Sequence, residues 1–167
     1  IPPFTLMGVS LAIFLGFRNS VSYERYWEAR KQWGALLIAA RALTRQVASF
    51  AANDRVLQKY VVRTLAAFAY ALKHQLRATD PQADLACRLN APALERAGKA
   101  RCVSSVILLG LAQRLAAEQK AGAFSEWQLQ SMDRNLNLLT EAGGACERIA
   151  NTPIPYTYRV LMNRTVM

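Results

Sequence analysis

Three apolar side chains recur at four-residue spacing near the start of the chain: Val9, Ile13 and Phe17. On a helix with about 3.6 residues per turn, this spacing places all three along one stripe. A ring of helices with such stripes turned inward would form a dry constriction, which is one device by which channels gate ion flow. The same spacing is typical of any buried helix, so a plain packed anchor helix stays open as an alternative.

A neighbouring stripe consists of small residues, Gly8, Ala12 and Gly16, again four apart. Small residues let helices pack closely in a bilayer, where apolar burial alone gives no association force. A small-residue stripe beside a bulky apolar stripe fits a ring of tightly packed copies.

Residues 1–17 carry no charge, and Arg18 follows at once. This contrast predicts a membrane-spanning pore helix over about residues 1–24 that emerges on the positive, cytoplasmic side. Glu24 lies close to the direction of the Val9 stripe, where it could meet an ion that leaves the constriction. The aromatic and charged residues that follow suit the membrane interface, and Arg25 and Lys31 can form helical ion pairs with Glu24 and Glu28.

The remaining sequence has helical spacing and no strand-like alternation long enough for a sheet, so the expected fold class is all-α. A cytosolic helical region should cover about residues 25–155, and residues 156–167 should lead into the next membrane segment. Asn53 and Asp54 are expected to form a turn and a helix N-cap, Ser125 is expected to begin a helix, and Ser104 or Ser105 should cap a helix that begins at Val106. We expect the chain to be an internal piece of a longer membrane protein. The expected helices after the first cover residues 55–77, 81–87, 93–98, 106–119 and 125–147.

Catalytic and metal-binding chemistry finds little support in the sequence. His74 is the only histidine, and Cys87, Cys102 and Cys146 are widely spaced, which is unsuited to a four-ligand zinc site. There is no glycine-rich phosphate loop. We therefore expect no enzyme activity, no metal and no cofactor.

The net charge of +10 suits an anionic partner. No aromatic nucleic-acid motif accompanies the basic residues, so we expect the inner face of a lipid bilayer rather than nucleic acid.

Two segments resemble signatures of one family. Residues 11–34, LAIFLGFRNSVSYERYWEARKQWG, resemble the bacterial branch of the bestrophin channels, and residues 151–164, NTPIPYTYRVLMNR, resemble a second signature of that branch. The resemblance implies an all-α subunit that assembles with itself into a homopentamer, a five-fold symmetric ring around one pore. It also implies a multi-pass protein of the bacterial inner membrane with a large cytoplasmic region.

The resemblance places the pore neck at Val9, Ile13 and Phe17, the stripe that helical spacing selects independently. It places a second constriction, at the cytosolic exit, on Trp127, where an aliphatic residue is usual. Animal members pass chloride and bacterial members can favour monovalent cations. Aliphatic side chains at Val9 and Ile13 remove aromatic ring edges that an anion could approach, which mildly favours cations among small inorganic ions. The alternative is a non-conducting, membrane-anchored helical module that binds a partner.

Overall fold

The computed structural model describes residues 3–152 and shows six helices there, without strands. The predicted all-α fold is confirmed. In the first helix, the structure describes the backbone but not the side chains of nine residues: Pro3, Phe4, Leu6, Met7, Ser10, Leu11, Phe14, Phe17 and Arg18. The helices are α1 (Pro3–Phe50), α2 (Arg55–Arg77), α3 (Gln82–Ala86), α4 (Ala91–Gly98), α5 (Val103–Lys120) and α6 (Glu126–Asn151).

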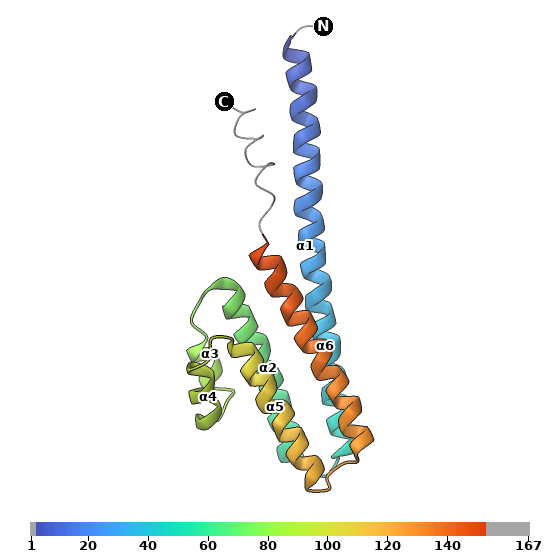
Figure 1. Cartoon of the computed structure of the whole chain (residues 1–167), viewed down its shortest axis with the longest axis vertical. Coiled ribbons are helices and arrows are strands. Elements are labelled where there is room, and N and C mark those ends of the chain that lie inside the picture. The colour runs from blue at the N-terminus through green and yellow to red at the C-terminus, as the bar shows by residue number, and fades with distance from the viewer. Residues whose placement is uncertain (1–2, 153–167) are drawn as a thin grey trace.

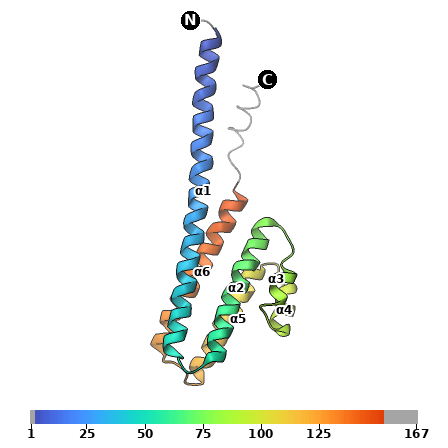
Figure 2. The same ribbon diagram turned by 180° about the vertical axis from the view of Figure 1, so that it is seen from behind.

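Helix α1 is one unbroken helix of 48 residues, and its first half extends well beyond the other described helices (Figure 1). Its second half packs along α6, while α2 packs against α5. The short helices α3 and α4 lie on the side of α2 and α5 away from α1 (Figures 1 and 2). The second half of α1, α2, α5 and α6 therefore form a four-helix bundle, from which the first half of α1 projects.

The bundle has a continuous apolar core because each long helix contributes fully buried side chains. Leu43 and Val47 come from α1, Leu57, Val61, Phe68 and Leu72 from α2, Leu111 and Leu115 from α5, and Met132 and Leu139 from α6. The ring of Phe68 packs against Gly143 on α6, and a Cβ added there would lie 3.6 Å from the ring, an ordinary contact distance.

The predicted cap of α2 is confirmed, and α6 starts beside Ser125, where a helix start was predicted. The Asp54 carboxylate accepts hydrogen bonds from the backbone N–H groups of Val56 and Leu57 at 3.0 and 2.9 Å. Ser125 and Gln128 form a reciprocal capping box at the start of α6. Both motifs satisfy N–H groups that a helix start leaves without partners.

The predicted start of α5 is wrong. The helix begins at Val103 rather than Val106, and Cys102 is the N-cap residue. Ser104 is buried and donates a hydrogen bond to the side chain of Gln75 on α2 at 3.0 Å, so its hydroxyl joins two helices instead of capping one. Residues 91–98 form α4, two residues longer than predicted, because Asn90 accepts a hydrogen bond from Ala93 N–H and caps the helix earlier.

Helix α1 crosses the expected boundary near residues 24 and 25 without a break. Across the part of the chain that is described, no helix combines the length and apolar character that crossing a membrane requires. The expected return of the chain to the membrane, residues 156–167, lies outside the described residues.

Candidate pore-lining site

The projecting half of α1 carries the predicted neck. The side chains of Val9 and Ile13 are 56% and 53% exposed, and Leu15 on the same stretch is also exposed. Phe17 lies in the same helix, and its side chain is outside the description. Exposed apolar side chains one turn apart, as Val9 and Ile13 are, indicate a surface that contacts lipid or another protein chain.

The small-residue stripe lies on the same projecting segment. Gly8, Ala12 and Gly16 are exposed, and a Cβ added at Gly8 or Gly16 would meet no atom within 4 Å. Among the described residues, no contact therefore requires glycine at these two positions.

Charged residues follow the apolar segment along α1. Glu24 is exposed. The predicted ion pair of Lys31 is confirmed, because its Nζ lies 2.8 Å from the Glu28 carboxylate. Hydrogen bonds from Lys31 and Gln32 hold the pKa of Glu28 below its ordinary value.

Arg25 has a different role from the predicted helical ion pair. Its guanidinium donates hydrogen bonds to the backbone carbonyls of Ile149 and Thr152, at the end of α6. The last carbonyls of a helix have no partner within that helix and carry partial negative charge, so a cation stabilises them. Arg25 thus fastens the end of α6 to α1 where α1 leaves the bundle.

A polar contact fastens the other end of α6. Gln46 on α1 is buried, and its Nε2 donates to Ser131 Oγ at 2.7 Å, while Asn135 Nδ2 donates to Gln46 Oε1 at 2.8 Å. The first turns of α6, which carry Trp127, are therefore held beside the second half of α1.

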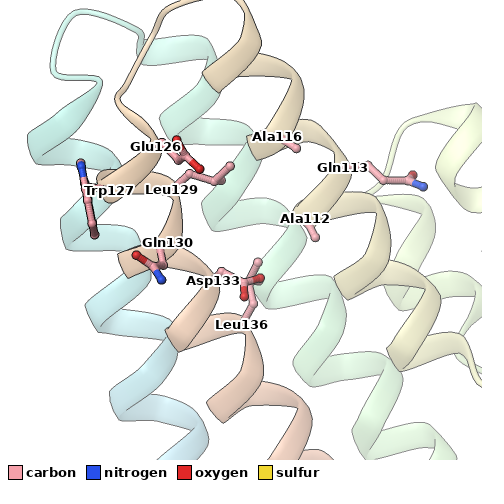
Figure 3. Close-up of a pocket in the computed structure, with 9 residues that line it drawn as sticks. All are labelled: Ala112, Gln113, Ala116, Glu126, Trp127, Leu129, Gln130, Asp133 and Leu136. Carbon is pink, nitrogen blue, oxygen red and sulfur yellow. The ribbon is translucent and has the colours of Figure 1, made fainter.

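Trp127 lies in the first turn of α6 and is 81% exposed. It borders an open cavity of about 720 Å³ between α5 and α6, and Figure 3 shows the indole at the edge farthest from Gln113. Among residues 3–152 nothing encloses the indole.

His74, the only histidine, takes part in a contact that joins two helices. His74 Nε2 lies 2.8 Å from the Asp84 carboxylate, which also accepts a hydrogen bond from Lys73 at 2.9 Å. These two hydrogen bonds lower the pKa of Asp84 and tie α3 to α2. Over residues 3–152 no group of three His, Cys, Asp or Glu residues could hold a metal ion.

Sequence spacing missed the two contacts that position α6. Arg25 belongs to the quoted motif, but its partners are backbone carbonyls more than a hundred residues away. Gln46 offered a weak signal, because it is a polar residue between Leu43 and Val47 on a helix face that is otherwise apolar. Polar side chains at buried positions usually find a hydrogen-bond partner.

Comparison with known proteins identifies the relatives of this chain. A family model described as "Bacterial/Fungal Bestrophin protein" matches residues 1–167. A voltage-dependent anion channel-forming protein of Ralstonia nicotianae is 44% identical over 166 residues, which cover 98% of this chain and 54% of that protein. The similarly named YneE of Escherichia coli K12 is 40% identical, with 98% of this chain and 54% of that protein covered. The chain thus spans about half the length of these relatives.

Solved structures give the same result. A crystal structure of a variant of a bacterial bestrophin homolog from Klebsiella pneumoniae superposes with a TM-score of 0.93 at 41% sequence identity, covering 98% of this chain and 61% of that chain. A second variant of the same homolog gives the same TM-score and identity, covering 99% and 60%. The expected family resemblance is confirmed in both sequence and fold.

Proposed function

Since the chain belongs to the bacterial and fungal bestrophin family, we propose that the full-length protein is the pore-forming subunit of an ion channel. The observation that carries the proposal is the projecting first half of α1, whose apolar side chains Val9 and Ile13 are exposed in this chain. Family membership supports a channel rather than an enzyme, and the curated relatives are named as channel-forming proteins.

In the proposed channel, five copies form a homopentameric ring in the bacterial inner membrane. About residues 1–24 of each copy line or support the pore, and about residues 25–155 form the cytosolic part. Gly8, Ala12 and Gly16 allow neighbouring helices to approach. The exposure of these small residues in this chain supports their use between subunits.

The neck acts as a hydrophobic gate. Rings of Val9, Ile13 and Phe17 offer no hydrogen-bonding partner to the water shell of a passing ion. A partly dehydrated ion there is costly, so conduction requires the ring to widen or fill with water. Below the neck, Glu24 meets the emerging ion, and five copies of Trp127 narrow the cytosolic exit.

Flux through liposomes that contain the full-length protein tests the neck. The triple variant V9A/I13A/F17A should raise the leak of small monovalent ions above that of the parent. A matched control, L109A, removes an exposed leucine of α5 far from the neck and should leave flux unchanged. Parent-like flux in an assembled triple variant would show that these residues do not line the pore.

The sign of the permeating ion is tested separately. The names of the relatives point to anions, whereas the aliphatic neck mildly favours cations. We retain a slight preference for cations over chloride as a prediction for the channel. The reversal potential of the reconstituted protein in asymmetric potassium chloride decides it, because a cation-preferring channel moves that potential toward the potassium equilibrium value.

A non-conducting anchored module is the alternative. Native mass spectrometry in detergent separates it from the channel, because the channel requires five subunits. A monomer or dimer without ion flux would replace the channel with the anchor module.

A further inference from the structure

The direction of the neck can be followed along α1, because α1 is one unbroken helix from Pro3 to Phe50 (Figure 1). At about 3.6 residues per turn, Trp27 and Arg45 follow Val9 by about five and about ten full turns. They therefore share its direction. Ile38 and Arg41 lie within a small rotation of the same line.

The bundle packs against the opposite side of α1. Leu36, Leu43 and Val47 are buried, and they lie about half a turn away from the Val9 direction. On the Val9 side, by contrast, Trp27 and Ile38 are 54% and 71% exposed, and Arg41 and Arg45 are exposed as well. If Val9 faces the central axis of the ring, then the exposed stripe below it also faces that axis.

We propose that Arg41 and Arg45 form two rings of positive charge in the cytosolic vestibule, between the neck and Trp127, that bind and concentrate small inorganic anions. This inference rests on the proposed channel function. It assigns the two arginines as specificity-determining residues, separate from the uncharged neck.

Among the basic side chains on this stripe, Arg41 and Arg45 are better placed to bind anions than Lys31. The charge of Lys31 is offset by Glu28 at 2.8 Å, whereas no ion pair involves Arg41 or Arg45 within residues 3–152. Acidic side chains flank the rings at some distance along the chain: Glu24 lies above them, and Glu126 lies beside Trp127.

The position of Arg45 along the pore axis follows from the contact that its neighbour Gln46 makes with α6. Gln46, next to Arg45, hydrogen-bonds Ser131 one turn after Trp127 on α6. Arg45 therefore lies near the level of the proposed exit. A confined space lined by one sign of charge raises the local concentration of the opposite ion and repels ions of its own sign.

The test compares full-length channels in liposomes with about 0.1 M potassium chloride on one side and a lower concentration on the other. The double variant R41Q/R45Q should lower the chloride-to-potassium permeability ratio by roughly tenfold, the lower end of the enrichment that a charged cleft produces. R41K/R45K keeps the charge and should retain the parent ratio. The control R101Q removes an exposed arginine between α4 and α5, far from α1, and should also match the parent.

Ionic strength provides a readout that does not depend on any variant. The screening length falls from about 10 Å at 0.1 M salt to about 3 Å at 1 M. The anion preference contributed by the rings should therefore shrink toward the R41Q/R45Q value when the parent is measured at 1 M salt. This measurement keeps the proposal testable should the glutamine variant fail to assemble.

Two kinds of failure are distinguishable. A conducting parent with a ratio unaffected by R41Q/R45Q or by salt would overturn the arginine rings and leave the channel intact, as would an equal shift in R101Q. A pentameric parent that passes no ions would overturn the channel function and the rings together.

Discussion

The guanidinium of Arg25 on α1 donates a hydrogen bond to the backbone carbonyl of Thr152, the residue that follows the last turn of α6. A second hydrogen bond to the Ile149 carbonyl makes the contact forked. Arginine suits this site because its planar donor groups reach two carbonyls at once. The contact joins the start of the bundle-packed part of α1 to the point where the chain leaves α6.

The substitution R25Q should lower stability. Hydrogen bonds from a charged donor contribute about 1.5–3 kcal/mol, and partial exposure of this site reduces the expected loss to about 1–2 kcal/mol. R25K should lose less, because one carbonyl keeps a charged donor. Thermal unfolding of the full-length protein in detergent measures the effect, and R30Q at an exposed position of the same helix is the control. Equal losses in R25Q and R30Q would show that the carbonyl contacts contribute nothing specific.

Gln46 and Ser131 should be energetically coupled. The hydrogen bond between them joins α1 to α6 at 2.7 Å, and the Gln46 side chain is buried. In a double-mutant cycle of Q46A and S131A, we expect a coupling of about 1 kcal/mol, the usual net value of one hydrogen bond. The pair Q46A and N137A is the control, because Asn137 is exposed on α6 and bonds to Asp133 instead. Additive effects for both pairs would contradict the prediction.

Shortening Trp127 should widen the cytosolic exit. The indole is 81% exposed at the first turn of α6, so W127A or W127I removes bulk without opening the subunit core. Single-channel conductance should rise in both variants, more in W127A than in W127I. The control L138A truncates another exposed apolar residue of α6 and should leave conductance unchanged. Parent-like currents in W127A would exclude Trp127 from the ion path.

Enlarging the small-residue stripe should prevent ring assembly. A Cβ added at Gly16 would meet no atom of the described residues within 4 Å, so we expect the main effect of G16I to arise where neighbouring helices approach. We expect native mass spectrometry to show loss of the pentamer in G16I while the helical content measured by circular dichroism is retained. G98I, at an equally open glycine of α4, should still assemble. A fully pentameric G16I would remove this stripe from the subunit contact.

The stability that Asp84 contributes should depend on pH. Its hydrogen bonds to His74 and Lys73 lower its pKa below the ordinary 3.8. A carboxyl with a lowered pKa in the folded state stabilises the fold above its unfolded pKa, and this contribution is lost as pH falls through the folded value. D84N should therefore melt below the parent at pH 7, and the gap should close under acid conditions below 3.8. The exposed control E141Q should show no such gap, and a pH-independent gap in D84N would assign the loss to packing.

The sequence predicted those helix starts that are set by hydrogen bonds between residues close together in the chain. Asp54 and Ser125 cap helices through bonds to N–H groups two or three residues ahead, so their residue types suffice to identify them. Ser104 is a serine like Ser125 but does not cap a helix, because its hydroxyl donates a hydrogen bond to Gln75 on another helix. A side chain that can cap locally or bond across the bundle takes the partner that packing supplies.

The sequence by itself determined the family, the helical fold and the apolar stripe of Val9, Ile13 and Phe17, since each depends on residue types at short and regular spacing. Only the tertiary structure decided that Arg25 fastens α6 and that Gln46 holds Ser131, and it alone placed the bundle opposite the Val9 direction of α1. Those contacts join residues far apart in the chain. Their geometry is set by how whole helices pack, and no local spacing encodes it.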